Sequence, residues 1–123
     1  MSFERKILIV EDEPSSLWVL AGLLKDYTLL IAETLKEALK ILYEEEISLA
    51  IIDIRLSKKE SDRSGLALIK VCKELKIPVI VVSAINDENV IANAQKLGAN
   101  EYLIKPIDAK KFQSIVKFLL TKN

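Results

Sequence analysis

The sequence predicts an α/β protein with a (βα)5 fold, in which a doubly wound, five-stranded parallel sheet carries helices on both faces. Short, almost entirely apolar stretches alternate five times with stretches of helical spacing that are apolar on one side only. Apolar runs rich in β-branched residues are typical of strands buried on both faces, and the alternation favours right-handed crossovers between parallel strands. No linker, repeat or low-complexity tract divides the chain. We therefore expect one domain over residues 1–123.

Composition excludes several classes of function. Half of the residues are hydrophobic, and 18 basic residues balance 18 acidic ones, which gives no support for a nucleic-acid or membrane surface. No apolar run approaches the roughly 20 residues of a membrane span, and Met1–Lys6 leads into a strand rather than a secretory signal. The absence of histidine excludes His-based triads, His-ligated zinc and a phosphohistidine carrier. We expect a soluble, cytoplasmic protein whose single thiol, Cys72, is buried.

The first two strand–helix units begin with the apolar stretches Lys6–Val10 and Tyr27–Ala32, which are predicted strands. After the first, Pro14 suits the opening turn of a helix that reaches about Lys25. After the second, Thr34–Glu37 has the pattern of a helix capping box. The apolar face of the helix that follows is predicted to comprise Leu35, Ala38, Leu39 and Leu42.

The third predicted strand, from about Ser48 to Ile54, contains one carboxylate, Asp53. Burying a charged and unpaired carboxylate at a strand end costs on the order of several kcal/mol. Taken alone, Asp53 could equally cap the loop that follows. That loop, Ser57–Gly65, is the most polar segment of the chain, and we expect it to lie on the surface.

The last two units complete the alternation. Pro78–Ser83 and Glu101–Ile104 are the predicted fourth and fifth strands, and a helix opened by Asp87 or Glu88 lies between them and ends at Gly98. Before the fourth strand, a helix from about Gly65 to Leu75 is predicted to bury Leu66, Ile69, Cys72 and Leu75. After the fifth, Asp108 is predicted to cap a helix that turns Phe112, Ile115, Val116 and Leu119 inward.

Reactive side chains gather at the ends of the predicted strands. Ligands of open α/β sheets bind beyond the carboxyl ends of the strands, and those ends carry Glu11, Asp12, Asp53, Ser83 and Lys105. Two carboxylates about 4 Å apart repel by roughly 4 kcal/mol at an effective dielectric of about 20, and one lysine offsets only part of that. A hard cation such as Mg²⁺ would relieve the rest. A cation, a lysine and a hydroxyl beside a carboxylate nucleophile form a site for a phosphoryl group.

These residues resemble the response-regulator receiver domains of two-component signalling. The resemblance covers essentially the whole chain and rests on motifs in order and at family-like spacing: Ile9–Glu13, Ile52–Arg55, Val82–Ala84 and Ile104–Pro106. Small residues at Gly65 and Gly98 also match. The resemblance implies the CheY-like, flavodoxin-like strand order 2-1-3-4-5.

The resemblance also implies roles for individual residues. Asp53 would accept a phosphoryl group from a phosphohistidine, forming an aspartyl phosphate. Lys105 would pair with that phosphate or with Asp53, and a cis bond to Pro106 would aim it. Ser83 would turn inward to bind the phosphate, and Tyr102, at the aromatic switch position, would follow it.

Magnesium is the cofactor that the resemblance implies. Asp12, Asp53 and the backbone carbonyl of Arg55 would bind Mg²⁺, with Glu11 acting mostly through water. The chain would then catalyse only its own phosphoryl transfer and dephosphorylation and would not be a metabolic enzyme.

As a phosphorylation-controlled switch, the domain would receive its phosphate from a sensor histidine kinase or a His-phosphotransfer protein of a phosphorelay. Its fourth helix, fifth strand and fifth helix would dock a downstream protein or form a phosphorylation-dependent dimer. No direct contact with nucleic acid or membrane is expected, and no output domain follows in this chain.

Several structural alternatives stay open. Tyr102 could be an edge-strand aromatic packed on the last helix, and Ser83 could cap the turn after its strand. Trp18 could be helix surface, packing, or a contact for the kinase.

Two features depart from the family: Ser57 stands where proline is usual, and the loop after Asp53 is longer. The resemblance further implies that Arg55 and Ile85, two residues after Asp53 and Ser83, would flank the path of the water that attacks the phosphate.

Three other functions compete with the switch. A Mg²⁺-dependent phosphohydrolase would need an acid two residues after Asp53, where Arg55 stands. A flavodoxin-like cofactor binder would need a phosphate loop rich in Ser, Thr and Gly after the first strand, where Glu11–Glu13 would repel phosphate. A receiver-like module that binds partners without phosphate would not need the reactive residues that this chain retains.

Overall fold

Ten elements alternate along the chain in the computed structural model, which describes residues 4–121. The lead-in at Met1–Phe3 and the chain end at Lys122–Asn123 lie outside the described residues. The strands are β1 (Lys6–Val10), β2 (Thr28–Ala32), β3 (Leu49–Ile52), β4 (Val79–Ser83) and β5 (Glu101–Ile104). The helices are α1 (Pro14–Leu23), α2 (Leu35–Glu44), α3 (Gly65–Glu74), α4 (Glu88–Leu97) and α5 (Ala109–Thr121).

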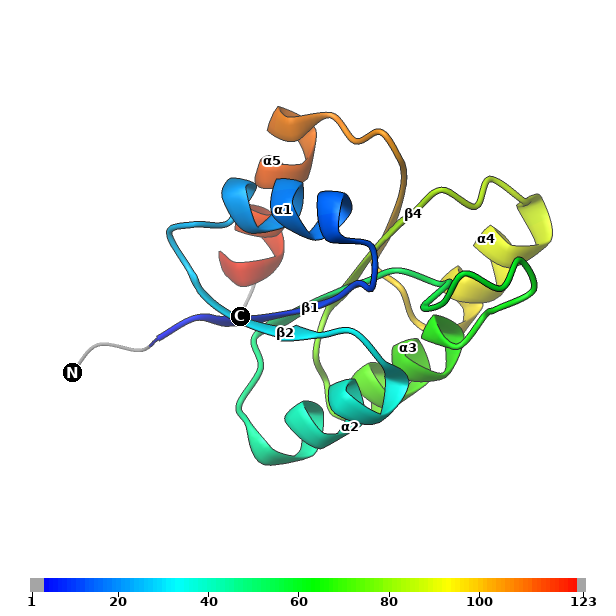
Figure 1. Cartoon of the computed structure of the whole chain (residues 1–123). Coiled ribbons are helices and arrows are strands. Elements are labelled where there is room, and N and C mark those ends of the chain that lie inside the picture. The colour runs from blue at the N-terminus through cyan, green and yellow to red at the C-terminus, as the bar shows by residue number, and fades with distance from the viewer. Residues whose placement is uncertain (1–3, 122–123) are drawn as a thin grey trace.

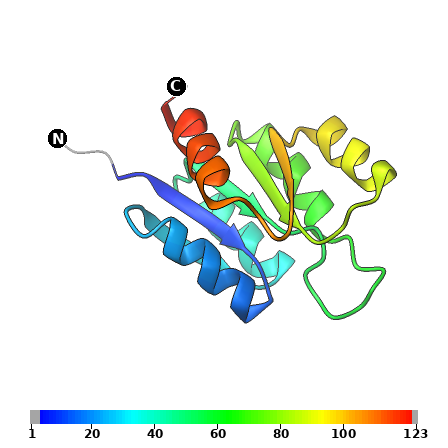
Figure 2. The ribbon, with the colours of Figure 1, turned by 90° about the horizontal axis from the view of Figure 1, so that it is seen from above.

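All five strands are parallel, and their order in the sheet is β2-β1-β3-β4-β5. Helices α1 and α5 cover one face of the sheet, and α2, α3 and α4 cover the other (Figures 1 and 2). The order reverses between β3, which is the central strand, and its neighbour β1. This confirms the predicted doubly wound fold and places the topological switch point at the carboxyl ends of these strands.

Each face of the sheet has its own hydrophobic core. On the α1–α5 side, Phe112 is fully buried against strand residues such as Ile9 and Ile51. On the other side, Cys72 and Leu68 are buried with residues of α2 and α4, so Cys72 is a core residue as predicted. Burial raises the pKa of the Cys72 thiol to about 12, which keeps it protonated and unreactive.

Two details of the prediction are wrong. β3 ends at Ile52, two residues before Ile54, because the Ile54 carbonyl accepts a hydrogen bond from the amide of Gly65 at the start of α3. Leu75 is 38% exposed rather than buried, since α3 ends at Glu74 and the chain turns away there.

Side-chain caps define the starts of the helices. The predicted box at Thr34 forms, with its hydroxyl accepting from the amide of Glu37. Asp87 rather than Glu88 caps α4. The cap of α1, which the sequence did not indicate, is Glu13, whose carboxylate accepts from the amides of Ser15 and Ser16. Within residues 4–121, no helix combines the length and apolarity needed to cross a membrane.

Candidate phosphoryl-acceptor site

The register of the central strands brings Glu11 and Asp53 side by side. Val10 pairs with Ile52, and each carboxylate follows its strand by one residue. The amide of Asp53 donates to the carbonyl of Val10 at 3.0 Å, so the parallel pairing extends to the acidic residue itself. Both residues are nearly inaccessible to solvent, with exposures of 1% for Glu11 and 7% for Asp53.

Lys105 joins these two carboxylates. Its Nζ donates to Oε1 of Glu11 and to Oδ2 of Asp53, each at 2.8 Å. The residue lies directly after β5, where its amide donates to the carbonyl of Ser83, and its peptide bond to Pro106 is cis. The sequence indicated Lys105 as a partner of Asp53 but not as a bridge that also holds Glu11.

The pKa values of this cluster follow from burial and charge. Burial raises the pKa of Glu11 more than its hydrogen bond to Lys105 lowers it. Burial also acts to lower the pKa of Lys105, but hydrogen bonds to Asp53 and Glu11 outweigh it, so that pKa is raised. A lysine that stays charged between two acidic groups stabilises negative charge on this edge of the sheet.

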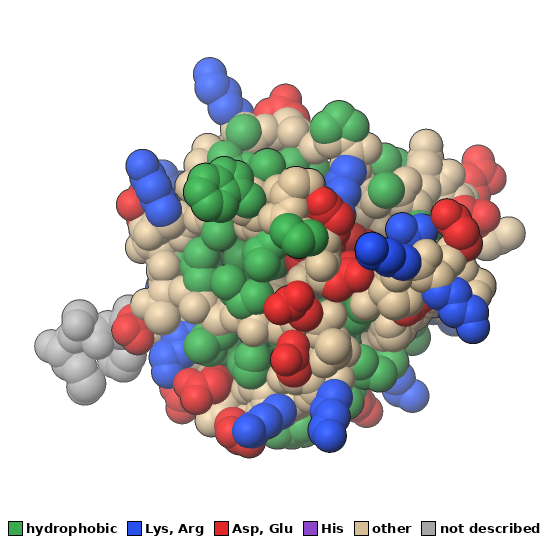
Figure 3. All heavy atoms as spheres, in the orientation of Figure 1, with side chains coloured by type: hydrophobic (Ala, Val, Ile, Leu, Met, Phe, Trp, Pro, Cys, Tyr) green, Lys and Arg blue, Asp and Glu red, His purple; other side chains and the backbone are tan. Residues whose placement is uncertain are grey.

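Asp53 opens onto a cleft of about 500 Å³. Its Oδ1 accepts from the amide of Arg55 at 3.3 Å, while Asp12, half-buried, lies on the wall of the same cleft. Figure 3 shows the molecule from the side seen in Figure 1, where acidic side chains gather near the middle of the surface, between hydrophobic and basic groups. Among the described residues, no three acidic, Cys or His side chains form a ready-made metal cage. A Mg²⁺ ion needs fewer, because it usually keeps several waters.

Ser83 lines the cleft, and Ile85 links it to Tyr102 on β5. Ser83 is fully buried, and its hydroxyl accepts from the amide of Ile85 at 3.2 Å, so it caps the turn here. The Tyr102 hydroxyl donates to the carbonyl of Ile85 at 2.8 Å. Tyr102 packs with the core on the α4 side rather than on the last helix.

Comparison with known proteins identifies the family. The response regulator receiver domain family matches residues 7–117. This chain belongs to that family. An NtrX-like response regulator of Rickettsia bellii is 36% identical over 115 residues, which cover 90% of this chain and 24% of that protein. The transcriptional regulatory protein ZraR of Escherichia coli is 31% identical over 90% of this chain and 25% of its own length.

Solved structures agree with the receiver fold. A CheY-like receiver domain from Methanospirillum hungatei has a TM-score of 0.86 and 26% identity, covering 98% of this chain and 96% of that one. The receiver domain of NtrX from Brucella abortus has a TM-score of 0.83 and 26% identity, covering 95% and 99%. This chain spans about a quarter of the two full-length relatives above. It is thus the receiver domain of a two-component response regulator, a class of signalling switches rather than metabolic enzymes.

Gly65 approaches the backbone of the acceptor Asp53 more closely than the sequence indicated. A Cβ atom on Gly65 would lie 2.1 Å from the carbonyl oxygen of Asp53 and 2.8 Å from Cα of Ile54, which is closer than real Cβ atoms come. Only glycine therefore lets α3 begin against the acceptor backbone. Its place in the family pattern was the available signal.

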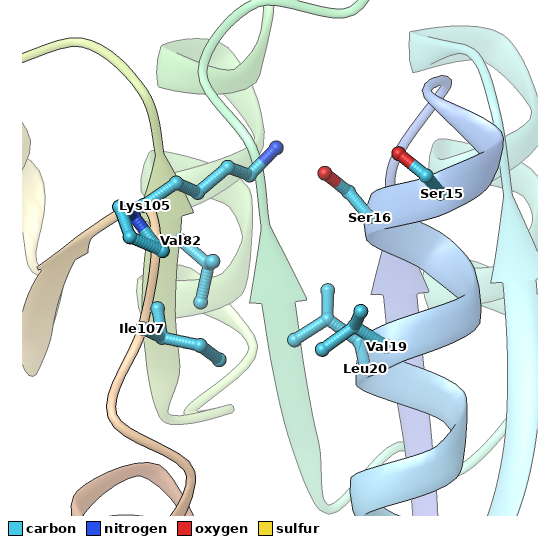
Figure 4. Close-up of a pocket in the computed structure, with 8 residues that line it drawn as sticks. Ser15, Ser16, Val19, Leu20, Val82, Lys105 and Ile107 are labelled. Atoms are coloured by element: carbon cyan, nitrogen blue, oxygen red, sulfur yellow. The ribbon is translucent and has the colours of Figure 1, made fainter.

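A second hollow of about 420 Å³ lies beside the acidic cleft, between α1 and the segment after β5. Figure 4 shows Lys105 extending toward the first turn of α1, with the hydroxyls of Ser15 and Ser16 pointing back toward it. Below them, Val19 faces Ile107 across an apolar floor. Trp18, on the same helix, is 82% exposed, so it is surface and not packing.

Proposed function

We propose that this receiver domain is a switch controlled by phosphorylation of Asp53. The observation that carries the proposal is the state of that carboxylate: it ends a buried central strand, is held by Lys105, and opens onto a cleft. A carboxylate with a purely structural role would not need to open onto a cleft. A nucleophile needs it, because the phosphoryl donor must reach an oxygen that is already oriented.

The transfer step is an attack by the Asp53 carboxylate on a phosphoryl donor. One oxygen attacks the phosphorus of a phosphohistidine on a kinase or phosphotransfer protein, and the P–N bond breaks with its electron pair going to the imidazole nitrogen. The amide of Arg55 and the ammonium of Lys105 keep the carboxylate in place. Lys105 then neutralises part of the charge that the phosphate adds. Water later hydrolyses the acyl phosphate, so the domain catalyses its own reset.

Receiver domains generally bind Mg²⁺ at their acidic site, and the oxygen-rich donor set here suits that ion. Asp12, Asp53 and the Arg55 carbonyl, which come from the lining of the cleft, would hold it, with Glu11 acting mostly through water. Bound Mg²⁺ would neutralise charge on the transferring phosphoryl oxygens.

Switching would pass through Ser83 and Tyr102. The Ser83 hydroxyl lines the cleft and accepts from the amide of Ile85, and it would donate its proton to a phosphate on Asp53. Movement of that turn would disturb the Ile85 carbonyl to which Tyr102 donates. A phosphate that binds one arrangement better than the other shifts their populations, and a coupling of about 1–3 kcal/mol changes partner affinity roughly 5- to 150-fold.

The partner surfaces follow from exposed apolar residues. On the α4–β5–α5 side, Ile104 is 37% and Phe118 62% exposed, which suits a downstream protein or a phosphorylation-dependent dimer. On α1, exposed Trp18 and Val19 suit contact with the phosphate donor. That residues 1–123 form a single domain, and that the protein works in the cytoplasm, stay predictions.

The test is incubation with acetyl phosphate and Mg²⁺, followed by intact-mass measurement. Wild type should gain the mass of one phosphoryl group, and Asp53→Asn should gain none. Chelating Mg²⁺ should abolish the gain in wild type. An Asp53→Asn variant that gains phosphate as wild type does would refute the assignment.

A further inference from the structure

The loop between β3 and α3 is folded around the carboxylate of Asp62. Oδ2 accepts from the hydroxyl of Ser57 at 2.6 Å, and Oδ1 accepts from the amide of Ser64 at 2.9 Å and from the Ser64 hydroxyl. These bonds hold the pKa of Asp62 well below its usual range. The loop is therefore locally ordered although it is polar and lies at the surface.

This order holds the backbone at Glu60, an exposed residue that lines the acidic cleft. Arg63 Nη1 donates to the carbonyls of Glu60 and Asp62, both at 2.8 Å, and so fastens the loop backbone. The Glu60 side chain is 97% exposed, and its Oε1 lies 3.4 Å from Nη1 of Arg55. Arg55, Glu60 and Arg63 line the same cleft as Asp53.

Arg55 consequently contacts two carboxylates. Its backbone amide donates to Asp53, while its guanidinium pairs with Glu60. An ion pair this exposed is weak, since water and salt screen it. A phosphoryl group on Asp53 would present more charge and more acceptor oxygens, which a guanidinium can bind with two parallel hydrogen bonds.

We propose that Arg55 and Glu60 form an electrostatic latch at the mouth of the cleft, in which Arg55 leaves Glu60 for the phosphoryl group on Asp53. The latch rests on the proposed function and adds a regulatory role for Glu60. Glu60 repels anionic phosphoryl donors and competes for Arg55, so it slows loading and shortens the life of the phosphate. Arg55 on the phosphate covers it from water and frees Glu60 to face partners.

A double-mutant cycle on the full chain tests the latch. Wild type, Glu60→Gln, Arg55→Gln and the double variant are phosphorylated with acetyl phosphate and Mg²⁺, and loading rate and phosphate half-life are followed by intact mass. Glu44→Gln is the matched control, because Glu44 is an exposed glutamate at the end of α2, away from the cleft. Each rate is repeated at high salt and with phosphoramidate, a donor that carries less negative charge.

Glu60→Gln should load about 2- to 5-fold faster and hold phosphate about 2- to 5-fold longer than wild type, the range expected from an exposed ion pair. The gain in half-life should vanish in the Arg55→Gln background, and the gain in loading should shrink with salt and with phosphoramidate. Unchanged kinetics in Glu60→Gln, an equal gain in Glu44→Gln, or a half-life gain that survives in Arg55→Gln would overturn the latch alone. A wild type that gains no phosphate would overturn the latch and the proposed function together.

Discussion

The cleft around Asp53 and the loop at residues 57–64 hold negative charge in opposite ways. In the cleft, burial raises the pKa of Glu11, and a lysine from the far end of the chain partly offsets this effect. In the loop, hydrogen bonds from Ser57 and Ser64 lower the pKa of Asp62. In the cleft, burial disfavours charge on Glu11 and a distant lysine offsets part of that effect, whereas in the loop several nearby hydrogen bonds favour charge on Asp62.

The range of these contacts explains the difference. Lys105 and Glu11 are 94 positions apart in the sequence, so their contact exists only when the whole sheet is formed. The bonds to Asp62 join residues at most five positions apart. Changes in the cleft should therefore affect chemistry and depend on the global fold, while changes in the loop should have small, local effects.

The largest effect is expected from Lys105→Met. It removes the ammonium group that bridges Glu11 and Asp53, so the two carboxylates repel each other and the phosphate loses a partner. Hydrogen bonds to charged groups of this strength predict a fall in the rate of phosphorylation of roughly 10- to 100-fold. Intact-mass kinetics with acetyl phosphate measure it. Lys110→Met, an exposed lysine on α5, is the control, and an equal loss in both variants would argue against the bridge.

A smaller effect, on stability, is expected where the cleft and the loop join. Gly65→Ala forces a Cβ onto the backbone of Asp53 and should lower the free energy of unfolding by about 1–3 kcal/mol. Gly22→Ala, in α1 with nothing within 4 Å, should raise it by about 0.5–1 kcal/mol instead. Urea unfolding compares the two. Equal changes would mean that the contact at Gly65 is not close.

The smallest effect is expected from Asp62→Asn, and it should depend on pH. Because the pKa of Asp62 is depressed by folding, its contribution is fully present above its unfolded value of about 3.9 and is lost as pH falls through the lower folded value. The variant should be about 1 kcal/mol less stable at neutral pH and should approach wild type in acid. Urea unfolding across pH 2–7 measures this, with Asp26→Asn as an exposed control. A deficit that grows as pH falls would contradict the sign.

The fold and the residues that lie near Asp53 could be predicted because both depend on where the apolar strands begin and end. Parallel strands share one carboxyl edge, so the pairing of Val10 with Ile52 brings the residues that follow them together. The bridging geometry of Lys105 could not be predicted from the sequence, because it depends on how β5 positions one flexible side chain over two carboxylates.

Local backbone contacts were the other feature that the sequence did not predict. The end of β3 and the close packing of Gly65 arise from a hydrogen bond between Ile54 and Gly65 across a loop of ten intervening residues. The loop around Asp62 contains only polar residues, which give no hydrophobic pattern to read. Its serines and aspartate are typical of turns, but the pairing among them follows from three-dimensional geometry.

The most direct test of the central claim is to locate the phosphate. Wild type is phosphorylated with acetyl phosphate and Mg²⁺, the acyl phosphate is reduced with borohydride, which converts phosphoaspartate to homoserine, and the peptides are sequenced by mass spectrometry. We predict homoserine at position 53 and at no other acidic position. Homoserine at position 12 or at another aspartate, or hydroxynorvaline at a glutamate, in a protein whose Asp53 remains unmodified would contradict the account.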